Sequence, residues 1–473
     1  MWRMQITCED GPNLDRSGRD GPAAARRDLD PYNRDEHQTD HEVSAMRRTV
    51  KQRRHLLVLG LTILALGGAG FAQETVSFPD SSLEAAIREA AYKLEGTLYD
   101  YDVSWVSILE AADRSISNLS GIGACPSLRD VDLSGNGLAN LGPLADLEIL
   151  SVLYLDDNAI SDVSPLRSLS RLSRLTLENN SIADISPLAA IGTLRTLTLK
   201  GNNVADLEPL RSLGLLEILS VTCPAGTNLD PIHSLADLVS LYVESDSALD
   251  LTALGRMPHL RELMLVSVRI AAFAPLRWAE ALRTLELKDI EVDSLVEVVD
   301  AVPQLEKIVL ESMAIADFAP LTELVHLTAI ELVDVGLTLD DLGLLLGFPV
   351  LEAVSIADNG FTEIGLVSAL EDLKVLDVSG NNISHLRTIA TLRHLETLVL
   401  RDNPIDDLEP ILALWELRSL DLRGTDVADI SHLLELPRLE FVDLRDTPLN
   451  TSPGSSGATT VELLRNKGVV VEL

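Results

Sequence analysis

Leucine recurs every 22 residues along most of this chain, and no other feature of the sequence limits the possible folds as strongly. The copy that begins at Leu150 reads LSVLYLDDNAI, and those from Leu172, Leu194 and Leu395 read LSRLTLENNSI, LRTLTLKGNNV and LETLVLRDNPI. A unit of this length is too short to bury its own leucines, so neighbouring copies must stack and share one continuous core. The sequence therefore predicts a solenoid in place of a rounded domain.

Fifteen copies of the unit align on their first leucine, and twelve of the fourteen intervals between them are 22 residues long. The alternation within each copy predicts one short strand, whose leucines point into the core and whose intervening side chains point outward. Strands repeated in this way form a parallel sheet on the concave side of a solenoid. A weaker copy begins at Val106, and the first leucines of the others are Leu128, Leu150, Leu172, Leu194, Leu216, Leu238, Leu260, Leu282, Leu305, Leu327, Leu351, Leu373, Leu395, Leu417 and Leu439.

The second half of each unit predicts the convex side. It reads SPL at Ser164 and again at Ser186. Proline fixes φ and removes a backbone donor, so short 3₁₀ turns are expected there in place of full helices. Residues 293–299 and 339–345 belong to longer copies that lack this proline, and they are expected to form a true helical turn.

An asparagine column accompanies the strands in part of the chain. Its side-chain amide is expected to satisfy backbone groups that the turn after each strand would bury. The column is lost in the middle repeats, so we expect a locally irregular or more mobile centre over residues 216–345. The asparagines are Asn136, Asn158, Asn180, Asn202, Asn359, Asn381 and Asn403, and the middle repeats carry Pro224, Asp246, Val268, Ile290, Met313 and Val335.

Each end of a solenoid exposes leucines and needs a cover. After Phe78, the spacing of Ser81 and Glu84 is that of a helical capping box, which predicts a helical cap within residues 73–127, together with the weak first repeat. The repeats should occupy 128–450. Within the C-terminal cap, 451–473, residues 459–467 predict a short helix and 469–473 a closing strand.

Residues 46–72 have the layout of an export signal. Residues 46–55 are basic, 56–72 are apolar, and small residues precede a cleavage point before Gln73. An uncleaved N-terminal anchor is the alternative. Residues 1–45 are expected to be a mis-called extension, or otherwise a disordered tail.

Charge and motif content exclude several functions. The net charge is −35, and residues 1–72 carry 11 basic and 10 acidic residues, so nearly all of the excess lies in the repeats. This charge opposes binding to nucleic acid and to anionic membranes. The sequence contains no zinc-protease, nucleophile-elbow or phosphate-loop motif, so we expect no enzyme, no cofactor and no metal site. Cys125 and Cys223 lie four repeats apart and are expected to be free thiols.

A family resemblance appears in the repeat unit. The stretch NAISDVSPL from Asn158 resembles the unit of bacterial internalin-type leucine-rich-repeat proteins, and the segment from Phe78 to Ile87 resembles the helical cap of that family. The resemblance covers residues 78–473. It implies a leucine-rich-repeat horseshoe and an exported binding protein that uses its concave sheet.

The phase of the repeat identifies candidate surfaces on that sheet. Valine and methionine at outward positions of the middle repeats suggest an apolar patch ringed by charge, where a protein partner would bind. In the last repeats Arg401, Arg423 and Arg445 form a column beside aspartates, which favours a self-paired ladder over a phosphate site. Asp130, Asp132, Asp156 and Asp157 are expected to be solvated charges and not a calcium site. The candidate partner-binding residues are Tyr242, Glu244, Met264, Val266, Glu286, Lys288, Val309, Glu311 and Val333.

The sequence thus favours an exported protein that binds a protein partner through its concave face. We expect it to be a monomer that is secreted, periplasmic or at the cell surface, with no membrane insertion beyond an N-terminal anchor. A cytoplasmic regulatory scaffold, like the phosphatase regulators with 22-residue repeats, and a surface adhesin are the alternatives.

Overall fold

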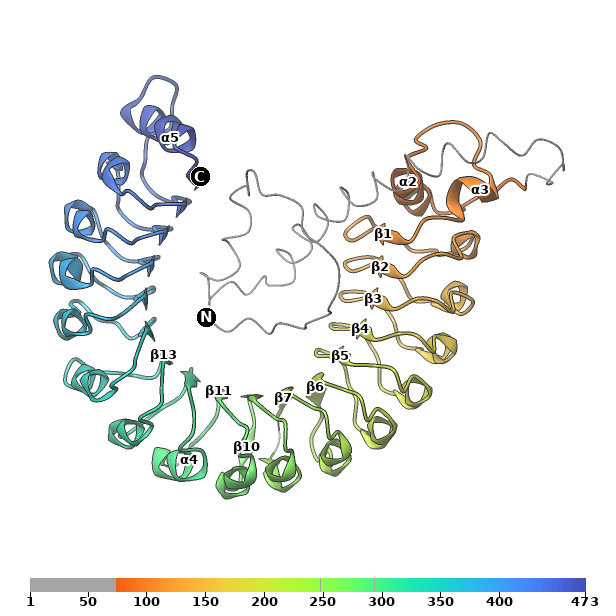
Figure 1. Ribbon diagram of the computed structural model, residues 1–473, viewed down its shortest axis with the longest axis horizontal. Coiled ribbons are helices and arrows are strands. Elements are labelled where there is room, and N and C mark those ends of the chain that lie inside the picture. The colour runs from red at the N-terminus through yellow and green to blue at the C-terminus, as the bar shows by residue number, and fades with distance from the viewer. Residues whose placement is uncertain (1–73, 247, 293) are drawn as a thin grey trace, which may run out of the picture. The chain divides into compact units, whose positions relative to one another are not determined.

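The computed structural model describes residues 74–473, apart from residues 247 and 293. The predicted extension 1–45 and the predicted export signal 46–72 therefore lie outside the described residues. Figure 1 shows the repeats as a curved stack, with the strands on its inner side and short helical turns on its outer side. The horseshoe predicted from the leucine period is confirmed.

One parallel sheet of 17 strands runs through the stack, with consecutive repeats paired, and a separate pair joins β8 to β10. The inward leucines of each strand are buried, as the alternation predicts. The strands are β1 Ile108–Glu110, β2 Asp130–Asp132, β3 Val152–Tyr154, β4 Arg174–Thr176, β5 Thr196–Leu199, β6 Ile218–Cys223, β7 Ser240–Ser245, β8 Ala248–Leu249, β9 Glu262–Val266, β10 Arg269–Ile270, β11 Thr284–Lys288, β12 Lys307–Glu311, β13 Ala329–Val333, β14 Ala353–Ser355, β15 Val375–Asp377, β16 Thr397–Val399, β17 Ser419–Asp421, β18 Phe441–Asp443 and β19 Val470–Glu472.

The outer side is built almost entirely of 3₁₀ helices, many with proline in the first turn, where its missing donor costs nothing. They are η3 Ile122–Ala124, η4 Gly142–Leu144, η5 Ser164–Ser168, η6 Ser186–Ala190, η7 Glu208–Ser212, η8 Asp230–Ser234, η9 Leu251–Arg256, η10 Ala274–Trp278, η11 Ala319–Glu323, η12 Asp341–Gly347, η13 Gly365–Ala369, η14 Arg387–Thr391, η15 Glu409–Ala413 and η16 Ser431–Glu435.

The two longer repeats, which lack the proline, differ from each other. The first forms the α-helix α4 (Leu295–Ala301), capped by the Ser294 hydroxyl, which accepts from the Val296 amide. The second forms only the seven-residue 3₁₀ helix η12. A helical turn was therefore correctly predicted in the first, whereas the extra residues of the second lengthen a 3₁₀ helix.

The N-terminal cap begins with helix α2 (Ser81–Ala90), followed by the short helix α3 (Asp100–Val103). The predicted capping box at Ser81 is wrong, because Asp80 is the N-cap and accepts from the amides of Ser82 and Leu83. Its other oxygen accepts from the amides of Ser117 and Asn118, which ties the cap to the first repeat. Burial acts to raise the pKa of Asp80, but these four amides together hold it below its ordinary value.

The C-terminal cap closes the other end of the sheet. Helix α5 (Ser456–Asn466) is capped by the Ser455 hydroxyl, and strand β19 pairs in parallel with β18. The predicted helix and closing strand are both confirmed. No helix among the described residues has the length and apolar character needed to cross a bilayer.

The middle repeats are not irregular, as the loss of asparagine had led us to expect. Strands β9, β11, β12 and β13 have five residues and β6 and β7 have six, whereas most strands of the flanking repeats have three. The prediction of an irregular centre is wrong because the backbone continues its ladder into the segment that the asparagine turn occupies elsewhere.

Candidate functional site

All nine predicted partner-binding residues lie on the five middle strands β7, β9, β11, β12 and β13. Sheet register sorts them into two rows that run across the strands. In the first row the neighbours are Tyr242, Met264, Glu286 and Val309, in that order. The second row, in order, consists of Glu244, Val266, Lys288, Glu311 and Val333.

The register does not produce the continuous apolar patch that the sequence suggested. Val309 is 0% exposed and lies between Glu286 and Glu331 in its row, so it offers no accessible surface. Lys288 and Glu311 separate Val333 from Val266. The predicted single patch is therefore wrong, because charged residues interrupt the apolar ones in every row.

Ion pairs between strands occupy the space between these apolar residues. The Lys288 ammonium lies 3.1 Å from a carboxylate oxygen of Glu311 and 3.4 Å from one of Glu286. Lys307 lies 2.8 Å from Glu331. Burial raises the pKa of Glu331 although Lys307 acts against it. Burial acts to lower the pKa of Lys307, but Glu331 beside it leaves that pKa above its ordinary value.

Tyr242, Met264 and Val266 remain as a half-buried group on two neighbouring strands, and we call them the β7–β9 patch. Tyr242 lies opposite Met264, and its hydroxyl donates to the Glu244 carboxylate at 3.1 Å. The ammonium of Lys200 lies 4.8 Å from the centre of the Tyr242 ring. Burial, followed by the charge of Glu244, raises the pKa of Tyr242, so its hydroxyl stays protonated as a donor.

Two family models of leucine-rich repeats match the chain, one over residues 150–190 and another over residues 124–142 and 391–408. The stretch 150–190 contains strands β3 and β4, and the other two stretches contain β2 and β16. The chain contains leucine-rich repeats.

Many solved structures are similar to this chain, and three of them come from bacteria. An internalin of Listeria monocytogenes, InlF, is 26% identical, with 78% of this chain and 96% of that chain covered and a TM-score of 0.43. The internalin C2 of the same organism is 23% identical, with 56% and 99% covered and a TM-score of 0.39. A leucine-rich-repeat protein of Leptospira interrogans is 19% identical, with 77% and 95% covered and a TM-score of 0.43. No curated protein matches the chain.

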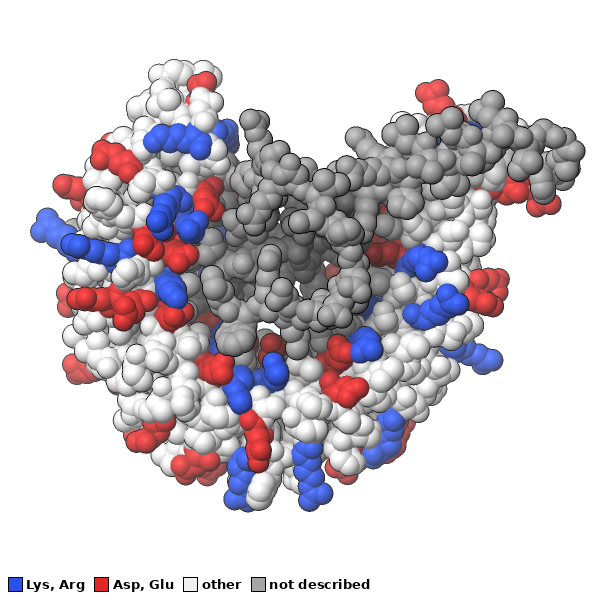
Figure 2. Space-filling view, viewed as in Figure 1, with Lys and Arg blue, Asp and Glu red and all other residues white. Residues whose placement is uncertain are grey.

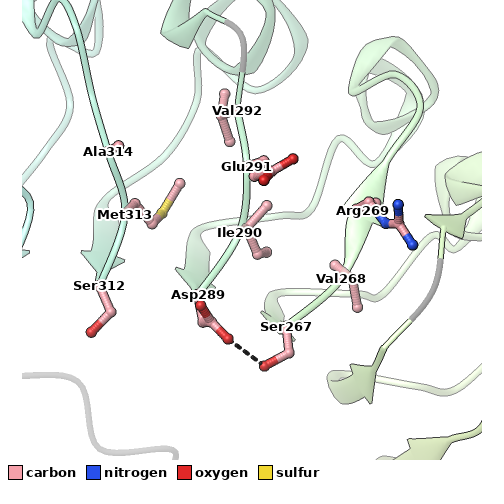
Figure 3. Close-up of a pocket in the computed structure, with 10 residues that line it drawn as sticks. All are labelled: Ser267, Val268, Arg269, Asp289, Ile290, Glu291, Val292, Ser312, Met313 and Ala314. Carbon is pink, nitrogen blue, oxygen red and sulfur yellow. Dashed lines mark hydrogen bonds between the residues drawn. The ribbon is translucent and has the colours of Figure 1, made fainter.

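A pocket that sequence reasoning missed adjoins the strand ends in the middle of this leucine-rich-repeat protein. Figure 3 shows its lining, which includes Val268, Ile290 and Met313, the residues that replace asparagine. On its rim the Ser267 hydroxyl donates to Asp289 at 2.9 Å. Within the described residues, no backbone hydrogen bond joins 290–292 to 268–270 or to 313–315. The missing asparagine was the signal that could have located the pocket.

The arginine column of the last repeats is self-paired, as predicted. Arg423 donates to both oxygens of Asp421, and Arg445 does the same to Asp443. On the face seen in Figure 2, acidic and basic side chains are likewise intermingled over the repeats. Arg401, the third residue of the column, lies 3.3 Å from Asp402, so each arginine of the column has an acidic neighbour within the fold.

The sequence also singled out the aspartates of the first repeats and two cysteines. Asp156 accepts from the Thr176 hydroxyl at 2.5 Å and the Glu178 amide at 2.6 Å. In the part of the chain that the structure describes, no three potential ligands gather around a metal position. Cys125 and Cys223 are free and buried, and burial raises the pKa of each thiol to about 12.

Proposed function

We propose that this leucine-rich-repeat protein is an exported binding protein that recognises a protein partner through its concave sheet, with the β7–β9 patch at the centre. The observation that supports this most is the register, which sets Tyr242 opposite Met264 and Glu244 opposite Val266. This places an aromatic ring, a thioether and a valine together at accessible positions on a rigid sheet.

The chemistry of this patch suits protein recognition. Tyrosine and methionine are enriched in the cores of protein interfaces, while charged residues gather at the rim. Glu244, Glu286, Lys288 and Glu311 surround the patch in the same two rows. Because Lys288 is already paired with two of these carboxylates, the rim would contribute orientation and selectivity more than net affinity.

This proposal changes the set of contact residues that the sequence suggested. Val309 leaves the set because it is buried, and Val333 becomes peripheral because two charged residues separate it from the patch. The partner would then contact β7 and β9 first.

Affinity capture with the full chain tests the proposal. Three baits are compared, namely the wild-type chain, Met264→Glu and the control Trp415→Ser. Trp415 lies just after η15, away from the β7–β9 patch in sequence, and its ring is also exposed. We expect the wild-type chain and the control to capture the same partner, and Met264→Glu to bind it roughly 100-fold more weakly, which is the effect of losing an interface hot spot.

A second substitution separates binding from misfolding. Tyr242→Ala removes the ring without adding a charge and should also weaken binding, while circular dichroism of both variants stays that of the wild type. A partner that binds Met264→Glu and Tyr242→Ala as tightly as the wild type would remove the patch from the proposal.

Export is tested independently of binding. We expect the chain in the exported fraction of the expressing bacterium, with its N-terminus near Gln73. Recovery from the cytoplasm would favour the regulatory scaffold. An exported chain that retains residues before Met46 would contradict our interpretation of the N-terminal extension.

A further inference from the structure

A group of exposed aromatic and apolar side chains follows helix α2 in the N-terminal cap. It consists of Tyr92, Leu94, Tyr101 and Trp105, which we call the cap patch, and these side chains are 51%, 70%, 50% and 36% exposed. The rings are ordered in pairs. Tyr92 stacks on Trp105 with centroids 6.4 Å apart, and Tyr101 stacks on Tyr99 at 5.4 Å.

The concentration of these rings is unusual for this chain. It has 4 tryptophans and 6 tyrosines in 473 residues, yet Tyr92, Tyr99, Tyr101 and Trp105 all fall within 14 residues. The described core of the repeats consists mainly of leucine, isoleucine and valine, with a few phenylalanines and no tyrosine or tryptophan. A cluster of accessible rings therefore points to a contact outside the solenoid.

The position of the cap patch indicates which contact this is. The Val76 amide donates to the Leu98 carbonyl at 2.9 Å, and the Asp100 amide donates to the Glu74 carbonyl at 3.0 Å. Thr75 forms an antiparallel bridge with Tyr99. Residues 74–76 are thus fastened to the loop that carries the rings, and they begin two residues after the apolar run 56–72 ends.

We propose that the cap patch docks on the surface of a lipid bilayer, the one that the apolar run 56–72 enters during export. Tryptophan and tyrosine prefer the boundary between headgroups and acyl chains, because one end of each ring is apolar and the other is polar. Leu94, the most exposed large side chain of the cap, would enter the acyl boundary with them.

Lys93 fits this interface as well. Its ammonium lies 5.5 Å and 5.9 Å from the ring centres of Tyr99 and Tyr101 and donates to Asp102 at 2.6 Å. This places the positive charge of Lys93 over the two rings and pairs it with a carboxylate of the same loop. Glu95 and Asp100 are exposed in the same loop, so the docked cap would favour zwitterionic headgroups over anionic ones.

Fluorescence of Trp105 provides a direct test in the full chain. The exported chain is mixed with phosphatidylcholine vesicles whose acyl chains are brominated, and tryptophan quenching is measured. We expect a quenched component that disappears in Trp105→Phe and persists in Trp415→Phe. Replacing part of the phosphatidylcholine with phosphatidylglycerol should weaken it.

Leu94→Ser measures the strength of docking. It should lower the ratio of docked to undocked cap roughly tenfold, which corresponds to about 1.4 kcal/mol, because an exposed leucine no longer enters the acyl region. Met264→Glu should dock like the wild type, so failure here is distinguishable from failure of the concave-face proposal.

Emission from Trp105 that brominated vesicles leave unchanged would overturn the proposal. So would equal quenching in Leu94→Ser, or quenching that increases with anionic lipid. Binding of the chain to cell-wall polysaccharide, lost in Trp105→Phe and accompanied by no vesicle quenching, would assign the cap patch to a glycan and likewise overturn it.

Discussion

The flanking repeats and the middle repeats complete the same turn in two different ways. In the flanks one asparagine side chain serves up to five backbone groups from two repeats, as Asn381 does. In the middle a buried apolar residue such as Ile290 takes its place and the strands become longer. Ser267 and Asp289 have the same positive φ as Asp157 and Asn179 in the flanks. The backbone therefore follows the same path in the middle repeats although the asparagine hydrogen bonds are absent.

The difference shows what the asparagine contributes. It links the turn of one repeat to the next, because its oxygen accepts from an amide 20 residues earlier. Where the asparagine is absent, the strand ladder gains residues but the turns lose this link, and the pocket of Figure 3 opens between them. Order in the sheet and order in the turns are therefore separable.

The largest effect is expected from Asn381→Ala. The substitution leaves two amides and three carbonyls without their partner, which should lower the free energy of unfolding by roughly 3 kcal/mol. Urea unfolding measures this. Asn382→Ala is the matched control, since its side chain is exposed, and it should change stability by less than about 0.5 kcal/mol. Equal effects would show that the ladder does not stabilise the flanks.

Introducing the asparagine into the middle should not reproduce the flanks. Ile290 is 3% exposed, and Ile290→Asn buries an amide in a turn whose neighbours are apolar. We expect a loss of about 2 kcal/mol in urea unfolding, against about 1 kcal/mol for the control Ile290→Val. A variant that gains stability would mean that the two turns are interchangeable, and the comparison would then fail.

Removing the positive charge of Lys307 from the middle of the sheet should destabilise the protein by an amount that increases with pH. Lys307→Met leaves Glu331 without its ammonium, so the already raised pKa of Glu331 rises further. A carboxyl group with a raised folded pKa contributes stability in its protonated form, and this contribution is lost as pH rises through that pKa. Relative to the wild type, the variant should be nearly unchanged at pH 4 and about 1.5 kcal/mol less stable at pH 8.

The exposed pair of Lys374 and Glu352 is the control for this measurement. Lys374→Met should cost less than about 0.5 kcal/mol at either pH, because water already screens the pair. If Lys307→Met lowers the free energy of unfolding by the same amount at pH 4 and pH 8, the loss would come from packing and not from the charge of Glu331.

Hydrogen exchange should locate the difference between the two kinds of repeat in the turns alone. The amides of Ile182 and Ile383 donate to asparagine oxygens at 2.9 Å. For Val292 and Ile315 no such bond exists within the described residues. These two amides should exchange roughly tenfold faster or more, while the middle strands exchange as slowly as the flanking ones. Fast exchange throughout β9–β13 would instead restore the mobile centre that the sequence suggested.

The smallest contrast concerns the two buried thiols. Cys125 lies beside the first repeats and Cys223 at the start of the middle, and burial raises the pKa of each to about 12. Iodoacetamide at pH 8 should leave both unmodified in the folded chain, because the thiolate is the reactive form, and should modify both in urea. Faster alkylation of Cys223 in the folded chain would reveal local opening of the middle repeats.

Much of this architecture was readable in the sequence, because the repeat sets the direction of every side chain. The inward leucines, the 3₁₀ turns, the closing strand and the paired arginines follow from residue type and phase. Of the predictions that failed, two needed the bonding partners or neighbours of a residue and not only the direction of its side chain. Asp80 is the N-cap because it also reaches the first repeat, and Val309 faces outward yet lies buried between long charged neighbours.

The candidate site was only partly predictable for the same reason. Phase placed nine residues on the concave face, but the register and the pairing of Lys288 decided which of them remain accessible. The aromatic rings of the cap were visible as a local concentration of tyrosine and tryptophan. Only the backbone bonds of residues 74–76 showed that the rings lie beside the first residues that the structure describes.

The parallel register fixes the spacing between the groups of this protein that a partner could contact. Neighbouring strands lie about 4.8 Å apart, so the outward side chains of a row are spaced at this distance, with one side chain per repeat. The extra residues of the two longer repeats lie outside the strands, around α4 and η12, and the pairing continues across them without a shift. Duplication or loss of a single repeat would therefore shift the binding groups on its two sides relative to each other by one strand spacing, while the register of the remaining repeats stays the same.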